Sequence, residues 1–151
     1  LPTGKAPLSE GFAVFREFLQ IKPDLHVGGQ VRNGTTKGID EYALAAYNAP
    51  FPDDDHKQGV RQFPNLVPGT PRTPSAEPNK EAWKILREWK KPFLCAFSDK
   101  DPIFSGVENS FYKLIPGCKD MPHVTIEDAG HFLQEDQPEA CVDAILSIKD
   151  I

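Results

Sequence analysis

Residues 91–102 read KPFLCAFSDKDP, an apolar run that closes in polar turn residues and a proline. Such a run is typical of a strand buried on both faces of a sheet. Residues 123–130, HVTIEDAG, predict a second short strand that ends in a loop. Amphipathic helical patterns lie before, between and after these strands, at residues 79–90, 107–117 and 137–150. Strands that alternate with helices in this way indicate an α/β fold with a parallel sheet.

The preceding part of the chain has helical patterns but no convincing strand. Residues 9–20, SEGFAVFREFLQ, predict a helix with Ser9 as its cap, and residues 39–47 predict a second, shorter helix. The glycine-rich stretch from Leu25 to Gly38 is interpreted as a loop. Prolines are concentrated between Pro50 and Pro78 and separate these helices from the strands. We therefore expect helices that cover a sheet formed by the later residues.

The composition excludes several classes of function. Acidic and basic residues are interleaved and sum to a net charge of −5, which argues against nucleic acid as a partner. Apolar runs are far shorter than the ~20 residues of a membrane helix, and residues 1–10 do not have the pattern of a signal peptide. The 3 cysteines, an odd number at wide spacing, fit neither a disulfide framework nor a zinc site. We expect a cytoplasmic protein without a membrane partner.

The first residue also carries information. The chain begins at Leu1 and contains a single methionine, Met121, whereas a complete gene product normally begins with methionine. We therefore expect a processed or partial chain.

Two loops carry the groups that could perform chemistry. In a parallel sheet, functional groups gather at the carboxyl ends of the strands, where this chain has SDKDP at residues 98–102 and EDAGHF at residues 127–132. Either Asp99 or Asp101 could hold the ring of His131 in one tautomer, leaving the other ring nitrogen to accept a proton. The alternative is structural, since an aspartate in a turn commonly caps a helix and a single histidine commonly packs. Spacing alone does not choose between the two aspartates.

Three longer tracts carry a resemblance to a known family. Residues 46–68 (AYNAPFPDDDHKQGVRQFPNLVP), 92–103 (PFLCAFSDKDPI) and 129–136 (AGHFLQED) together resemble the cap and carboxyl-terminal half of haloalkane dehalogenases, within the α/β-hydrolase superfamily. The resemblance implies a helical cap region with its connecting loop at residues 1–78. It also implies that residues 79–151 form the carboxyl-terminal part of the hydrolase core.

The same resemblance implies roles for the loop residues. Asp101 corresponds to the acid of the catalytic triad, Asp99 to a turn residue and His131 to the general base. In the family a carboxylate displaces halide from carbon, and the histidine activates water to hydrolyse the resulting alkyl-enzyme ester. The nucleophilic aspartate is expected upstream and is absent from this chain; GTTKG at residues 34–38 is interpreted as a turn. The implied partners are a small apolar halogenated substrate, water and the halide product, with no cofactor or metal and a monomeric intact enzyme.

The resemblance also implies an apolar substrate pocket. Phe15 occupies the position where the related enzymes have a cap tryptophan that donates an N–H group to the halide, and phenylalanine has no such donor. Phe12 and Phe15 have a structural alternative, because aromatic residues at helical spacing usually pack against a core. The pocket residues implied by the resemblance are Phe12, Phe15, Phe63, Pro64, Val67 and Ile103.

Two other functions stay open at the level of the sequence. An epoxide hydrolase would use cap tyrosines as donors, but Tyr42 and Tyr47 are spaced awkwardly for one helix face. A non-catalytic remnant would leave strand edges and apolar faces unpaired and would tend to associate. A calcium site at Asp53–His56 is excluded, because a calcium loop would need glycine and glutamate where the chain has Gln58 and Pro64.

Overall fold

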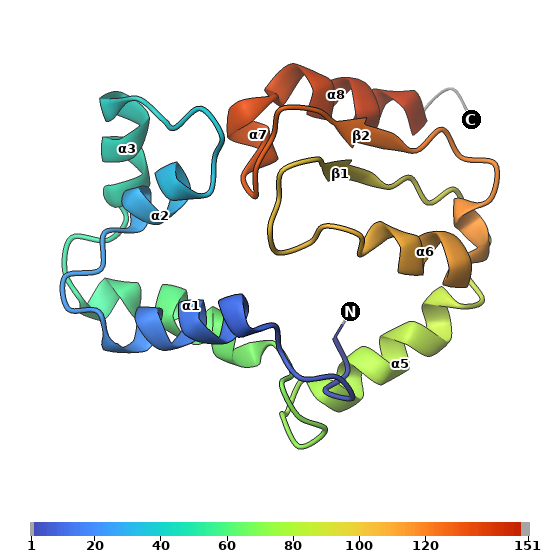
Figure 1. Ribbon diagram of the computed structural model, residues 1–151, viewed down its shortest axis with the longest axis horizontal. Helices are drawn as coiled ribbons and strands as arrows, with labels where there is room; N and C mark the ends of the chain where they lie inside the picture. Colours follow the sequence, from blue (N-terminus) through green and yellow to red (C-terminus); the bar gives the residue numbers. More distant parts are fainter. Residues whose placement is uncertain (1, 149–151) are drawn as a thin grey trace. The chain divides into compact units, whose positions relative to one another are not determined.

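The computed structural model describes residues 2–148 (Figure 1). The chain forms two compact units: one comprises the chain up to Val27 with Ala45–Ile85, and the other comprises Gly28–Leu44 with the chain from Leu86 onward. The α-helices and strands are α1 (Glu10–Ile21), α2 (Val27–Asn33), α3 (Glu41–Asn48), α4 (Gln58–Gln62), α5 (Ala76–Leu86), β1 (Ala96–Ser98), α6 (Glu108–Leu114), β2 (Val124–Ile126), α7 (Leu133–Asp136) and α8 (Pro138–Ser147). Short 3₁₀ helices are η1 (Asp55–Lys57), η2 (Phe63–Leu66) and η3 (Pro116–Cys118).

The first unit is helical and is organised around α1. Ser9 caps this helix, as predicted, with its hydroxyl oxygen accepting the N–H of Phe12 at 3.3 Å. At the other end, the Arg61 guanidinium of α4 donates to the carbonyl oxygens of Leu19 at 2.5 Å and Lys22 at 3.0 Å. These carbonyls would otherwise lack partners, and a cation there also complements the helix dipole. Arg61 thus fixes α4 against the carboxyl end of α1.

The second unit contains the sheet. β1 and β2 pair in parallel, with Ala96 opposite Val124 and Ser98 opposite Ile126. Figure 1 shows α8 beside β2, and its Ala144 joins Ile126 and Ala129 in the buried core of this unit. Partly buried Leu94 and other apolar side chains pack around that core. The predicted α/β class is therefore confirmed, with a parallel sheet and helices packed against it.

Most predicted elements are present, with three differences. The stretch from Leu25 to Gly38, interpreted as a loop, contains α2, whose Val27 and Val31 are both buried one helical turn apart. Tertiary packing of these valines overrides the low helix propensity of Gly28 and Gly29. The helix predicted over residues 79–90 lies instead at Ala76–Leu86. Both strands have the predicted positions, but each pairs over 3 residues only.

The predicted boundary between cap and core near residue 78 stays a prediction. The end of the last predicted helix, at residues 149–150, lies outside the described residues.

His123 joins the start of β1 to the segment that precedes β2. Its Nδ1 accepts the backbone N–H of Cys95 at 3.1 Å, so Nε2 carries the ring proton and donates to the carbonyl of Cys118 at 2.9 Å. The ring also lies 4.3 Å from that of Tyr112 on α6, measured between centroids. The sequence indicates no partner for His123, and in the structure its ring joins two backbone segments.

Replacing His123 with phenylalanine tests this bridge. The change keeps an aromatic ring beside Tyr112 but leaves the N–H of Cys95 and the carbonyl of Cys118 without partners. We expect the free energy of unfolding, measured in urea, to fall by about 2 kcal/mol. His56→Ala is the control, because that side chain is exposed, and its effect should stay within about 0.5 kcal/mol. Equal losses in both variants would contradict the assigned role of His123.

Candidate active site

The loops that follow β1 and β2 are held together by backbone hydrogen bonds beyond the last residue pair of the two strands. The N–H of Asp99 donates to the carbonyl of Ile126 at 3.1 Å, and the N–H of Lys100 donates to the carbonyl of Ala129 at 3.0 Å. The Lys100 ammonium also pairs with the carboxylate of Asp128. These contacts fix the two loops side by side at the carboxyl edge of the parallel pair.

Asp101 is buried in the first of these loops, with a relative exposure of 6%. Its Oδ1 accepts the N–H of Ile103 at 2.7 Å, which closes a tight turn across Pro102. Its Oδ2 faces Nδ1 of His131 at 3.0 Å. A carboxylate with one oxygen committed to its own turn has a fixed orientation, so the second oxygen is aimed at the imidazole.

The ring of His131 is oriented from three sides. Because the Asp101 carboxylate can only accept, Nδ1 of His131 carries the proton of their hydrogen bond, and Nε2 is the nitrogen available to accept another. The Phe104 ring stacks on the imidazole at 5.5 Å, and the Phe132 ring meets it edge-on at 5.1 Å. The His131 side chain keeps 30% relative exposure. It can therefore meet a reacting molecule without losing its orientation.

Asp99 has a different environment from Asp101, although only Lys100 separates them. Its exposed carboxylate accepts the N–H of Ala129 at 3.1 Å. This N–H donation holds the pKa of Asp99 below its usual value, with smaller help from the charge of Lys100. Asp99 therefore stabilises the turn, whereas Asp101 contacts the histidine, a distinction that spacing alone did not provide.

A third carboxylate, Asp136 at the end of α7, connects the histidine loop to residues 34–37. Its side-chain oxygens accept N–H groups from Gly130 at 2.8 Å, Thr36 at 2.9 and 3.0 Å, and Lys37 at 3.1 Å. Burial would raise the pKa of Asp136, but these donations hold it below the ordinary aspartate value. Sequence reasoning missed this contact. The only signal was the glycine pair of GTTKG, interpreted simply as a turn.

Close packing leaves no room for a side chain at two glycines of this junction. A Cβ atom on Gly130 would lie 2.5 Å from the carbonyl oxygen of Gly34, and one on Gly34 would lie 2.6 Å from the Phe132 ring. The N–H of Phe132 donates to that same Gly34 carbonyl at 3.2 Å. Asp136 therefore holds Gly130 and Gly34 holds Phe132, so both residues that flank His131 are fixed.

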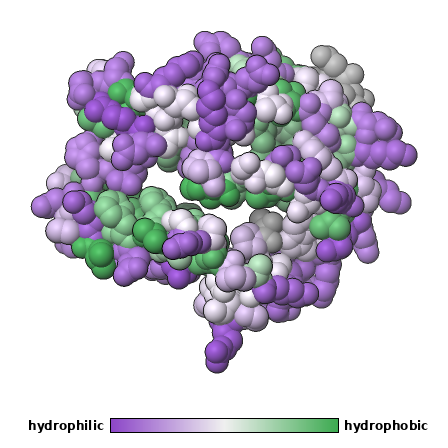
Figure 2. Space-filling model, in the orientation of Figure 1, coloured by the Kyte–Doolittle hydropathy of each residue, from purple (hydrophilic) through white to green (hydrophobic). Residues whose placement is uncertain are grey.

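The predicted pocket residues are divided between the two units. Ile103 follows Asp101 in the second unit and is exposed. The other five lie in the first unit, where Phe12 and Phe15 on α1 have ring centroids 6.4 Å apart and Phe63 on η2 is 73% exposed. Figure 2 shows apolar surface gathered over α1. Whether the predicted set lines one pocket stays a prediction.

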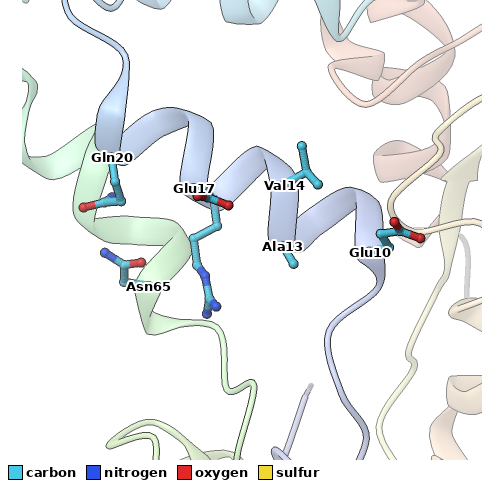
Figure 3. A pocket seen from close by; sticks show the side chains of 7 residues that line it. Glu10, Ala13, Val14, Glu17, Gln20 and Asn65 are labelled. Atoms are coloured by element: carbon cyan, nitrogen blue, oxygen red, sulfur yellow. The ribbon is translucent and has the colours of Figure 1, made fainter.

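An open depression of about 390 Å³ also lies along α1, but its lining does not suit a haloalkane (Figure 3). It includes the carboxylates of Glu10 and Glu17 and none of the predicted pocket residues. Its full lining is Glu10, Ala13, Val14, Arg16, Glu17, Gln20 and Asn65.

Other chemistries find little support in the described part of the chain. Within residues 2–148, no group of three or more His, Cys, Asp or Glu side chains is arranged to hold a metal ion. In the acidic tract, Asp53 pairs with His56 and Asp54 pairs with Arg61. Burial, reinforced by the neighbouring Cys118, raises the pKa of the Cys95 thiol to about 12, which makes it a poor nucleophile. No described helix has the length and apolar character needed to cross a membrane.

Comparison with known proteins gives the same family as the sequence tracts. A haloalkane dehalogenase of Psychrobacter cryohalolentis is 50% identical over 139 residues, which is 92% of this chain and 46% of that protein. One of Mycolicibacterium paratuberculosis is 39% identical over 147 residues, 97% of this chain and 48% of that protein. The chain is a homologue of the haloalkane dehalogenases. It spans about half the length of the curated relatives it matches.

Solved structures agree on the fold. A haloalkane dehalogenase from Paraglaciecola agarilytica, described as tetrameric, matches with a TM-score of 0.82 at 28% identity, over 96% of this chain and 48% of that one. The dehalogenase DatA of Agrobacterium tumefaciens matches with a TM-score of 0.70 at 18% identity, over 95% and 53% of the two chains. No family model matches the chain. Our expectation of a monomer stays a prediction.

The different contacts of the two aspartates lead to a direct comparison of variants. In a full-length protein that contains this chain, Asp101→Asn should lower any turnover that depends on His131 by about a thousandfold, because the amide no longer favours the tautomer with the proton on Nδ1. Asp99→Asn is the matched control and should change turnover by about twofold at most, because an amide oxygen still accepts the Ala129 N–H. Steady-state halide release measures both. The opposite ranking would mean that Asp99 is the functional carboxylate.

Proposed function

We propose that this chain forms part of a hydrolase that cleaves carbon–halogen bonds in small haloalkanes, and that it supplies the acid Asp101 and the base His131. One contact supports the proposal above all: Oδ2 of a buried carboxylate lies 3.0 Å from Nδ1 of a partly accessible histidine. The pair stands in strand-end loops of a homologue of haloalkane dehalogenases. Three free cysteines fit a reducing, cytoplasmic location for this enzyme.

In the first step, a carboxylate oxygen attacks the carbon that bears the halogen. A bond forms between that oxygen and the carbon while the carbon–halogen bond breaks, and the halide leaves with the bonding electron pair. We expect this nucleophile in the part of the relatives that the chain does not span. His131 takes no proton in this step.

In the second step, His131 activates water. Its Nε2 accepts a proton as the water oxygen adds to the carbonyl carbon of the alkyl-enzyme ester. The bond between the carbonyl carbon and the alkyl oxygen then breaks. The departing oxygen takes up one of the two protons of the water and leaves as the alcohol, and loss of the other proton to solvent restores the carboxylate and the neutral imidazole. The overall products are alcohol, halide and a proton, and no redox or cofactor step is required.

Asp101 acts through the imidazole in this scheme. Its Oδ2 holds the proton on Nδ1, so that the unprotonated Nε2 faces the reaction, and its negative charge stabilises the imidazolium that forms. Because Asp101 is buried and has its other oxygen bonded to Ile103, it does not need to be reoriented when the proton moves. This preorganisation lowers the barrier of the hydrolytic step.

The proposed substrate is small, apolar and halogenated. Apolar side chains around the reacting carbon would exclude bulk water from the ester, and the proposed lining is Phe12, Phe15, Phe63, Pro64, Val67 and Ile103. Release of halide also distinguishes this activity from epoxide opening, which produces none. Assays with a bromoalkane and an epoxide of similar size separate the two functions.

His131→Gln tests the role of the base. Halide displacement does not use His131, so the variant should release about one equivalent of halide per enzyme and then stop with the alkyl ester in place. Rapid-quench halide assays and intact-protein mass spectrometry measure the burst and the ester. His56→Gln, a change at an exposed histidine, should turn over normally. Sustained turnover by His131→Gln would contradict the assignment of the base.

Phe15→Trp tests whether the missing indole N–H at this position limits displacement of the halide. An indole N–H at this position should stabilise the leaving bromide or chloride and speed its displacement by about tenfold. Phe12→Trp is the control, since it adds an indole to the same helix three residues away. Single-turnover alkylation rates provide the measurement. No effect at Phe15, or equal effects at both positions, would argue that the halide is held elsewhere.

A further inference from the structure

Among the described residues of the second unit, Asp136 is the most enclosed carboxylate, with 4% relative exposure. Its two oxygens accept N–H groups from three residues, Gly130, Thr36 and Lys37. The Lys37 ammonium donates to the backbone carbonyl of Asp136 at 3.1 Å. Three backbone N–H groups therefore stabilise the carboxylate directly.

These donors come from two segments that meet at the histidine. Gly130 immediately precedes His131 in the chain, whereas Thr36 and Lys37 lie almost a hundred residues earlier. Oδ2 of Asp136 bonds to Gly130 and Thr36, and Oδ1 bonds to Thr36 and Lys37. A single side chain thus connects the backbone before the imidazole to a separate turn.

The other side of His131 is fixed by the same turn. The N–H of Phe132 donates to the carbonyl of Gly34, the atom that would lie 2.5 Å from a Cβ on Gly130. The backbone on both sides of the imidazole is therefore held in place by residues 34–37, through Asp136 on one side and directly by Gly34 on the other. A shift of this turn would move His131 relative to Asp101, which is anchored separately by its bond to Ile103.

We propose that Asp136 is a positioning residue for His131, acting through Gly130 and the turn at residues 34–37 to set the imidazole against Asp101 and the attacking water. The proposal rests on the proposed function of His131 as the base. It assigns Asp136 an effect on ester hydrolysis and none on halide displacement, because only hydrolysis uses the imidazole.

Asparagine at position 136 tests whether Asp136 positions His131 or only stabilises the fold. It retains one oxygen for Thr36 and Lys37, but its NH₂ group would meet the N–H of Gly130, donor against donor. The link to the histidine loop is broken while the side-chain volume is kept. A misplacement of about 1 Å can cost up to about a hundredfold in rate.

The experiment measures both chemical steps in the complete enzyme that contains this chain. With a bromoalkane in rapid-quench assays, Asp136→Asn should release its halide burst at the wild-type rate and hydrolyse the ester about tenfold to a hundredfold more slowly. Glu139→Gln is the matched control. It makes the same carboxylate-to-amide change at an exposed residue three positions further along the chain, so both steps should proceed at wild-type rates.

Each outcome has a distinct meaning. If the wild-type enzyme releases no halide from haloalkanes, the proposed function fails. If the wild type turns over and Asp136→Asn hydrolyses the ester normally, or slows both steps equally, the positioning role is overturned. If Asp136→Asn does not fold, Gly130→Ala takes its place, because its Cβ would displace the Gly34 carbonyl. The same selective loss of hydrolysis would then support the proposal, and normal hydrolysis would overturn it.

Discussion

The parallel pairing of β1 with β2 is the constraint on which the second unit depends. Parallel strands end at the same edge of a sheet, so the register that places Ser98 opposite Ile126 also brings the following loops together. Asp101 lies three residues beyond one strand and His131 five residues beyond the other. An antiparallel arrangement would send these loops to opposite ends. The hydrogen bond between Asp101 and His131 is thus a consequence of strand direction as well as of residue choice.

The three residue pairs between β1 and β2 are too few to hold such loops rigidly, and polar side chains supply the remaining order. Asp99 accepts the N–H of Ala129, Asp101 accepts the N–H of Ile103, and Asp136 accepts N–H groups from both segments at the histidine loop. Each satisfies a backbone donor that would otherwise be costly to bury. The three carboxylates therefore have different partners and different tasks, although all three are aspartates near one sheet edge.

The sequence was sufficient to predict the features that depend on local pattern. The Ser9 cap and the two strand positions follow from periodicity and turn chemistry. The helix α2 was not predicted, because the low helix propensity of Gly28 and Gly29 outweighed the helical spacing of Val27 and Val31. The Asp136 link was missed because Thr36 is a hundred residues away in the chain, and no local rule connects them. Spacing left the choice between Asp101 and Asp99 open, and only the family resemblance favoured Asp101. The structure shows that Asp101 contacts His131 and Asp99 contacts Ala129, and the catalytic role of Asp101 stays a prediction.

Isotope labelling tests the central claim, hydrolysis of a covalent ester by water that His131 activates, most directly. In a single turnover of the complete enzyme in H₂¹⁸O, the alcohol should leave with an unlabelled oxygen from the enzyme carboxylate, and the label should appear on that carboxylate. Repeated turnover should then release labelled alcohol. Labelled alcohol in the first turnover would mean that water attacks the substrate carbon directly, and the two-step account would be wrong.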